Sequence, residues 1–232
     1  VRMEVGQSLS SFYGYKVIGY FNSAAEVASS PAQDGKGLGR FRYADINGDG
    51  KITTDDRTFL GSPVPTYTGG INVGLTYRNF EFATYLYASA GNKIWNQSKW
   101  FTDFFGTFEG SGKGERAKQS WTPELGNSAA APIWESASNM STSAGANSWY
   151  VENGDYIRVQ NISLGYNIPK SYTSKLGIKR AKFTLSANNL LTITKYKGLD
   201  PGVGGAADTG FGIDVGNYPV TRSFNASINL TF

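Results

Sequence analysis

The 232-residue chain contains no cysteine and no histidine. Without cysteine it can form no disulfide, no thiolate metal site and no cysteine nucleophile. Without histidine it lacks the most common catalytic base and metal-ligating side chain. A catalytic site would need carboxylates, lysine, tyrosine or serine, and the sequence offers no carboxylate pair that would flank a cleft as in a glycosidase. We therefore expect that the protein is not an enzyme.

Charged residues are also scarce. They make up 17% of the chain, against about 25% in typical globular domains. The net charge is +4, and the 22 Lys and Arg residues are scattered and never form a run like those of nucleic-acid-binding arms. We expect no nucleic-acid partner. Because 40% of the residues are hydrophobic, intrinsic disorder is excluded and the chain should fold, alone or with a partner.

No hydrophobic run is long enough for a membrane-spanning helix. The longest uncharged stretch, residues 58–77, is interrupted by Pro63, Pro65 and several glycines, so it cannot form such a helix. The first ten residues carry Arg2 and Glu4 without an apolar core, which predicts no signal peptide there. A spanning β-barrel stays possible, because its strands of about 10 alternating residues produce no hydrophobic run.

Glycine and aromatic residues are abundant, with 29 Gly and 14% aromatic residues, which favours strands and turns. The clearest predicted strand covers residues 224–232, where apolar and polar uncharged side chains alternate strictly. Alternation or aromatic enrichment predicts further strands at residues 71–77, 81–89, 162–168 and 183–188, and weaker strands at 13–20 and 39–43. The sequence therefore predicts an all-β protein built from antiparallel strands.

The predicted connections are short at one end of the strands and long at the other. Arg78 and Asn79 join two strands directly, whereas residues 90–155 and 195–221 form long polar connections. This asymmetry is typical of outer-membrane barrels, and soluble sandwiches usually have short loops at both ends. We interpret the chain as an antiparallel transmembrane β-barrel segment in which 90–155 and 195–221 are long extracellular loops.

Helices are predicted to be short and local. Ser23 and Glu26 form a possible capping box ahead of a helix over residues 24–29, and Gly177 would close a helical turn over 171–176. Residues 136–148 are of low complexity, and we expect them to form a mobile loop.

Residues 45–56 match the calcium-binding loop of an EF-hand, with Gly50 at the position of the sharp turn. The expected ligands are the side chains of Asp45, Asn47, Asp49 and Asp56, the carbonyl of Lys51 and, through water, Thr53. Calcium requires several converging oxygen atoms at about 2.3–2.6 Å. Asp in place of Glu at the last position predicts a weaker site. The alternative is a metal-free turn held by side-chain-to-backbone hydrogen bonds.

Aromatic residues are concentrated in the predicted loop 90–155. They are Trp95, Trp100, Phe101, Phe104, Phe105, Phe108, Trp121, Trp134 and Trp149. Exposed aromatic rings can stack on sugars or grip a partner protein. We favour the alternative that they build a small core of the loop itself.

Several motifs occur in one order along nearly the whole chain. They are residues 11–16 (SFYGYK), 43–50 (YADINGDG), 60–65 (LGSPVP), 153–158 (NGDYIR), 161–166 (NISLGY), 187–192 (ANNLLT) and 196–201 (YKGLDP). In this order they resemble the carboxy-terminal part of the SusC/RagA family of TonB-linked (TonB-dependent) outer-membrane proteins. The collinear set makes the resemblance far more specific than any one motif.

This resemblance implies a transporter in the outer membrane of a Gram-negative cell. Its barrel would have about 22 strands around an amino-terminal plug, and it would import glycans or peptides with TonB energy, lidded by a SusD-like surface lipoprotein. The chain has no plug-like region and no TonB-contacting segment, and its predicted strands are too few to close such a barrel. We therefore expect residues 1–232 to be the carboxy-terminal portion of the receptor barrel.

The expected partners of this portion are the remaining barrel and plug, in the same protein or another chain, and the outer-membrane lipid. TonB would act through the missing amino-terminal part. The alternative is a secreted, calcium-stabilised β-sandwich that binds carbohydrate. A sandwich would be soluble alone, whereas a piece of a barrel would need detergent. The sequence does not distinguish a glycan from a peptide substrate, nor a natural split subunit from a fragment.

Overall fold

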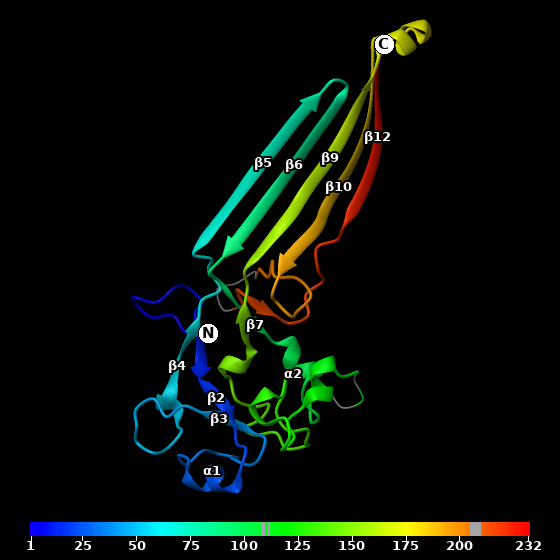
Figure 1. The fold of residues 1–232 in the computed structure, drawn as a ribbon. Coiled ribbons are helices and arrows are strands. Elements are labelled where there is room, and N and C mark those ends of the chain that lie inside the picture. The colour runs from blue at the N-terminus through cyan, green and yellow to red at the C-terminus, as the bar shows by residue number, and fades with distance from the viewer. Residues whose placement is uncertain (108–109, 111, 205–209) are drawn as a thin grey trace. The chain divides into compact units, whose positions relative to one another are not determined.

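The computed structural model describes residues 1–107, 110, 112–204 and 210–232, which form two compact units (Figure 1). Unit 1 contains Val1–Val64, Lys93–Asn153 and Gly202–Asn217. Unit 2 contains Pro65–Asn92, Gly154–Pro201 and Tyr218–Phe232. Within these residues the protein is mainly β, with open antiparallel sheets and no closed barrel.

Unit 2 is built on one five-stranded sheet in the order β12-β10-β9-β6-β5, in which all neighbours are antiparallel. The strands are β5 (Tyr67–Tyr77), β6 (Phe80–Ala90), β9 (Tyr156–Ile168), β10 (Arg180–Thr194) and β12 (Ser223–Thr231). Each of them overlaps a strand predicted from alternation or, for β6, from aromatic enrichment. The prediction is therefore confirmed, although β5, β9 and β10 extend several residues beyond it.

The connections of unit 2 at one end of the sheet are short, as predicted. Arg78, in the left-handed region with a φ of 54°, lies in the turn between β5 and β6. Between β9 and β10 the chain forms α3 (Lys170–Thr173) and η5 (Ser174–Leu176). Gly177 ends this turn with a φ of 70°, a conformation that glycine adopts at little cost.

Unit 1 contains short strands in three small sheets. Its strands are β1 (Phe12–Tyr15), β2 (Val17–Tyr20), β3 (Phe41–Tyr43), β4 (Arg57–Gly61), β7 (Lys93–Asn96), β8 (Val151–Asn153) and β11 (Ile213–Asp214). The single strand predicted at residues 13–20 is wrong, because β1 pairs with β4 while β2 pairs with β3. The pairing of β7 with β11 is parallel, which departs from the expected antiparallel arrangement.

The helices of unit 1 are short. They are α1 (Ala24–Ser29), η1 (Thr54–Asp56), α2 (Ser98–Thr102), η2 (Glu115–Gln119), η3 (Gly126–Ser128) and η4 (Ser148–Tyr150). The predicted cap of α1 is confirmed, since the Ser23 hydroxyl accepts from the backbone N–H of Glu26 at 3.1 Å. The Glu26 carboxylate accepts from Asn22 instead of Ser23. Among the described residues, no helix has both the length and the apolar character required to cross a membrane.

Aromatic side chains form the core of unit 1. Tyr15 stacks on Tyr43 and Tyr20 on Phe41, with ring centroids 5.0 and 5.7 Å apart. The predicted loop 90–155 contributes to this core, since Phe104 and Trp121 are buried and Trp95, Trp100 and Trp149 pack against it. Trp134 and Phe105 are exposed, and Phe108 lies outside the described residues. The favoured interpretation, that these aromatic side chains build a core, is therefore confirmed for most of the described ones.

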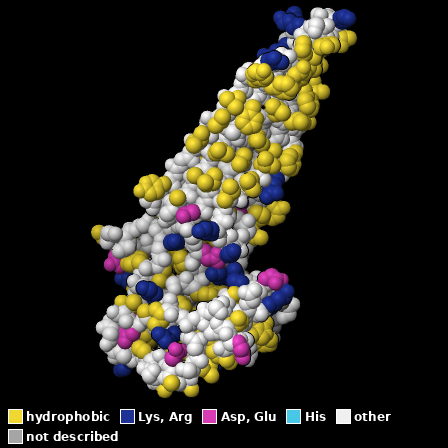
Figure 2. Space-filling view, viewed as in Figure 1, with side chains coloured by type: hydrophobic (Ala, Val, Ile, Leu, Met, Phe, Trp, Pro, Cys, Tyr) yellow, Lys and Arg dark blue, Asp and Glu magenta, His cyan; other side chains and the backbone are white. Residues whose placement is uncertain are grey.

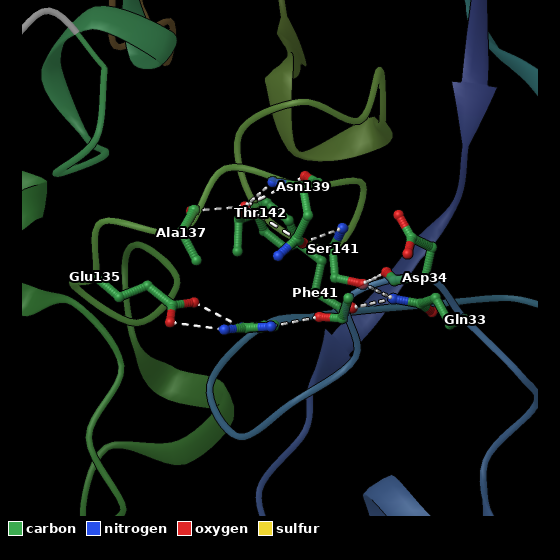
Figure 3. A network of polar contacts seen from close by, with 10 residues as sticks. Gln33, Asp34, Phe41, Glu135, Ala137, Asn139, Ser141 and Thr142 are labelled. Atoms are coloured by element: carbon green, nitrogen blue, oxygen red, sulfur yellow. Dashed lines mark hydrogen bonds and ion pairs between the residues drawn. The ribbon is translucent and has the colours of Figure 1, made fainter.

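Residues 136–148 pack against this core through a network of polar contacts (Figure 3). Gln33 donates to the Phe41 carbonyl and to the Ser141 hydroxyl, both at 2.7 Å, and accepts from the N–H of Tyr43. Nearby, Arg40 and Glu135 form a bidentate ion pair at 2.7 and 2.8 Å. The prediction of a mobile loop is therefore wrong, because these small hydroxyl and amide side chains satisfy buried backbone groups.

Candidate functional site

The sheet of unit 2 presents one apolar face, and its strand register explains why. One row across the five strands contains Leu75, Phe82, Leu164, Leu185 and Ala226, and the next contains Tyr77, Phe80, Tyr166, Phe183 and Ile228. Directly opposite residues in a sheet share a face, so the alternation of single strands adds up to a continuous surface. Figure 2 shows hydrophobic side chains spread over the sheet.

This apolar face is exposed. Leu75 is 62% exposed, Leu185 49% and Ile228 65%. The face is hollowed over the small side chains of Ala187 and Ala226, in a depression of about 530 Å³ that Phe82 and Phe224 also line. Apolar areas of this extent mark a surface that contacts a protein or a membrane.

The opposite face of the same sheet is polar and mostly uncharged. Its rows contain residues such as Asn161, Ser163, Ser186, Asn188 and Asn225. The Asn161 amide donates to the Asn188 side-chain oxygen at 2.8 Å, and the Asn188 amide donates to Ser223 at 3.1 Å. Side chains of this type remain compatible with water while they pair across strands. This face is therefore suited to a wet environment.

Two ionic clusters involve the strands that carry the polar face, the second together with Asp200 beyond the end of β10. Glu81 accepts from Asn167 and from Lys182, both at 2.5 Å. Arg158 donates to Thr192 at 2.9 Å and to Asp200 at 2.5 Å. The sequence analysis did not identify these residues. Of the charged residues in the two clusters, only Glu81 lies in a predicted strand. Arg158 and Lys182 lie just outside the strands predicted at 162–168 and 183–188, so the sequence pattern did not place them on a shared face.

Both edges of the sheet are open within the described part of the chain. β5 pairs with β6 alone and β12 with β10 alone. An edge strand of eleven residues such as β5 leaves a row of backbone groups available for pairing with another strand. The sheet is therefore able to continue on both sides.

The predicted calcium loop of unit 1 is closed by side-chain-to-backbone hydrogen bonds. The Asp45 carboxylate accepts from the N–H groups of Gly48 at 2.7 Å and Gly50 at 2.8 Å. The Asn47 side-chain oxygen accepts from Asp49, and the Asp49 carboxylate accepts from Lys51 at 2.8 Å. These contacts bend the chain around Asp45 and leave Asn47, Asp49 and Lys51 exposed.

Asp56, the last predicted ligand, is buried. Its carboxylate accepts from the N–H groups of Ile46 at 2.8 Å and Thr53 at 2.7 Å. Burial opposes ionisation of this carboxyl, but the backbone N–H donors outweigh it and hold the pKa of Asp56 below its usual range. In this structure the Asp56 carboxylate joins the two ends of the loop.

The donor set of the loop fits a calcium ion only in part. Carboxylate oxygens that accept one N–H keep a further lone pair for a cation, and Asp45, Asn47 and Asp49 come from one turn. Among the described residues, however, no three Asp or Glu side chains are grouped so that they could hold a metal ion. Calcium binding by Asp45, Asn47, Asp49, Lys51 and Asp56 stays a prediction.

If calcium binds, we expect chelation to increase protease cutting within residues 45–60. The increase should be about tenfold when calcium is present at ten times its dissociation constant, since a bound ion stabilises by mass action. Asp49→Ala should produce the same increase, and chelation should add nothing further in that variant. Asp55→Ala is the matched control, because Asp55 is an exposed carboxylate outside the expected ligand set. Unchanged cutting after chelation, with no metal in the purified protein, would show a metal-free turn.

Comparison with known proteins identifies relatives along the entire chain. No family model matches it. The chain is 34% identical to TonB-dependent receptor P26 of Formosa agariphila over its full length, and 32% identical to TonB-dependent receptor P3 of the same organism over 98% of its length. It is 26% identical to TonB-dependent receptor SusC of Bacteroides thetaiotaomicron over 99% of its length. The chain is homologous to part of SusC/RagA-type TonB-dependent receptors.

The chain spans less than a quarter of these relatives, covering 23%, 22% and 20% of their lengths. Among solved structures, a chain of the RagAB peptide transporter matches with a TM-score of 0.73 at 24% identity, over 96% of this chain and 22% of that one. A chain of the RagAB peptide importer in the open-open state matches with a TM-score of 0.71 at 23% identity, over the same shares. These structures show the fold. The resemblance indicated by the motifs is therefore confirmed for the type of receptor to which the chain is homologous.

The homologues agree with two further predictions from the sequence. TonB-dependent receptors are transporters and not enzymes, and they are outer-membrane proteins.

Proposed function

We propose that this chain forms part of the barrel wall of a SusC/RagA-like outer-membrane transporter. The observation that carries the proposal is the five-stranded sheet of unit 2, with an exposed apolar face and a polar opposite face in continuous register. β5 and β6 have eleven residues each, and a tilted strand needs about 9–11 residues to cross a bilayer. The apolar face would contact lipid and the polar face a water-filled lumen.

The open edges of the sheet support the same proposal. A barrel has no unpaired edge because every strand has two neighbours. β5 and β12 would therefore pair with strands of the remaining barrel, in the same protein or in another chain. This portion would be the carboxy-terminal one, as the order of the sequence motifs indicates, and the whole barrel would have about 22 strands.

The alternative of a secreted carbohydrate-binding β-sandwich is less well supported. A sandwich buries the apolar faces of two sheets against each other. In this chain the apolar side chains of β5 and β12 are exposed, for example Ile71 at 62% and Phe224 at 72%. A lipid bilayer would cover this apolar face, so a second sheet is not needed.

The transported substrate is proposed to be a peptide or a glycan. The structures with a similar fold belong to a peptide transporter, RagAB, which supports an oligopeptide and an assembly with a SusD-like lipoprotein corresponding to RagB. In this proposal residues 90–155 and 195–221 lie outside the cell, where they would meet the lipoprotein. The plug and the segment that contacts TonB would come from the rest of the receptor.

Cysteine labelling along β12 tests which face meets lipid. The chain has no cysteine of its own, so single substitutions report on one position each. With the protein assembled in outer-membrane vesicles, a hydrophilic thiol reagent should label cysteine at Asn225, Ser227 and Asn229. It should spare Ala226, Ile228 and Leu230, because these face the bilayer. Equal labelling of both sets would contradict the barrel wall.

A further inference from the structure

Basic residues gather at the end of the unit 2 sheet where the connections are short. They are Arg78 in the turn between β5 and β6, Lys170, Lys175 and Lys179 between β9 and β10, and Arg180 at the start of β10. Figure 2 shows Lys and Arg side chains together at this end. We call these five residues the basic cluster.

No member of the basic cluster forms a salt bridge with a described acidic side chain, although the charge of Arg180 interacts with Glu81. The sequence contains no Asp or Glu between Asp155 and Asp200. The acidic side chain nearby on β6, Glu81, is already paired with Lys182 at 2.5 Å. None of the salt bridges among the described residues includes a member of the cluster. A local excess of positive charge therefore remains.

Three members of the basic cluster line a hollow that also has amide side chains in its wall. Lys170, Lys179 and Arg180 line it together with Asn79 and Asn167, and its volume is about 480 Å³. The Lys179 ammonium donates to a main-chain oxygen of Phe232, the last residue of the sequence, at 3.0 Å, and the Arg180 guanidinium donates weakly to Asn167 at 3.4 Å. An ammonium has three donors and a guanidinium five, so both groups keep donors for an anion.

Exposed apolar side chains adjoin the basic cluster. Tyr172 and Leu176 lie in the helical connection that also carries Lys170 and Lys175, and they are 71% and 73% exposed. Tyr77, 68% exposed, precedes Arg78 and supports its guanidinium 5.3 Å from the ring centre. Aromatic rings beside lysine and arginine are characteristic of protein surfaces at the boundary between lipid and water.

We propose that the basic cluster binds the phosphate head group of an anionic phospholipid, of the phosphatidylglycerol type. The inference rests on the proposed function, in which this sheet crosses the membrane and its short connections face the periplasm. The guanidinium of Arg180 offers a planar pair of donors to two phosphate oxygens, and Lys170, Lys179 and the Asn79 amide supply further donors around the hollow. A lipid is favoured over free phosphate because Tyr172 and Leu176 provide apolar contact beside the charges.

The test compares lipid binding by the complete receptor that contains this chain, purified from its membrane in detergent. Native mass spectrometry would count bound palmitoyl-oleoyl phosphatidylglycerol and, separately, phosphatidylcholine with the same chains. The unmodified protein should bind the anionic lipid preferentially. The variant Lys170→Gln, Lys179→Gln, Arg180→Gln should bind it about a hundredfold more weakly, since each basic residue near an anionic lipid surface contributes about fivefold.

A matched variant controls for total charge. Lys195→Gln, Lys197→Gln, Arg222→Gln removes the same charge from residues beyond the other end of β10 and just before β12, and it should retain the preference. Should the first triple variant fail to assemble, Arg180→Gln alone is expected to weaken binding about fivefold. No preference in the unmodified protein, equal losses in both triple variants, or displacement of the lipid by millimolar inorganic phosphate would overturn the proposal.

Labelling along β12 and lipid binding together distinguish a wrong lipid site from a wrong membrane position of the sheet. If the labelling pattern along β12 appears as expected while the lipid preference is absent, the lipid site alone is wrong. If the labelling pattern is also absent, the membrane position of the sheet is wrong.

Discussion

Leu185→Lys is expected to destabilise the assembled protein by about 2–4 kcal/mol, the effect of a lysine at the lipid-facing midplane of a barrel. Leu185 lies between Leu164 on β9 and Ala226 on β12 in the apolar face, and its side chain is 49% exposed. In water this substitution would be almost neutral at such an exposed position. In the proposed bilayer the ammonium would lose its hydration, which explains the large effect.

The matched control is Ser186→Lys, one residue along β10. Ser186 pairs with Ser163 and Asn225 on the polar face, so its ammonium would stay in water and the change in stability should be small. The measurement is guanidinium unfolding of the receptor in lipid vesicles, together with the amount found in the outer membrane. Equal stability of both variants would mean that the face containing Leu185 does not contact lipid.

The sheet of unit 2 could be predicted largely from sequence because alternation is a local signal. This alternation signal was interrupted where the register between β9 and β10 shifts. β10 is irregular between Asn188 and Leu191 against β9, and Asn189 there has a φ of 51°. Asn189 and Leu190 interrupt the pairing with β9, so the alternation is broken there, although Leu191 and Ile193 beyond them are exposed apolar residues like Leu185. The prediction therefore stopped at residue 188, whereas the strand continues to Thr194.

Unit 1 was less predictable, because its structure depends on contacts between residues far apart in sequence. Gln33 and Ser141, 108 residues apart, share a hydrogen bond. Its strands have five residues or fewer, so a period of two has too few positions to be recognised. Composition did indicate an aromatic core, since aromatic side chains in a long polar segment must be buried or serve as contacts.

The candidate sites were predictable to different degrees. The spacing in residues 45–56 gave the turn around Asp45, which the structure contains. The burial of Asp56 and its two backbone donors depend on how Ile46 and Thr53 approach each other, and spacing alone does not determine this. The basic cluster needed the fold as well, because Arg78 is almost a hundred residues away from Lys170 to Arg180 in the chain.

Lys99→Met is expected to destabilise unit 1 by about 3–5 kcal/mol, the cost of removing one partner from a buried ion pair. Lys99 is 7% exposed. Its ammonium lies 2.8 Å from the Glu152 carboxylate, donates to the Trp149 carbonyl at 2.6 Å and sits over the Trp149 ring. Burial lowers the pKa of Lys99, while the charge of Glu152 opposes that shift. Without the ammonium, Glu152 would remain as a largely buried negative charge.

Lys118→Met provides the comparison, since Lys118 and Glu115 form a pair of nearly the same length, 2.9 Å, with side chains 74% and 87% exposed. Solvent screens such a pair, so its removal should have no measurable effect. Protease cutting within residues 93–153 of the membrane-embedded receptor would report the difference. Cutting should rise by about two to four orders of magnitude in Lys99→Met if it follows the population of the open form. Similar cutting in both variants would show that burial of the pair does not stabilise this unit.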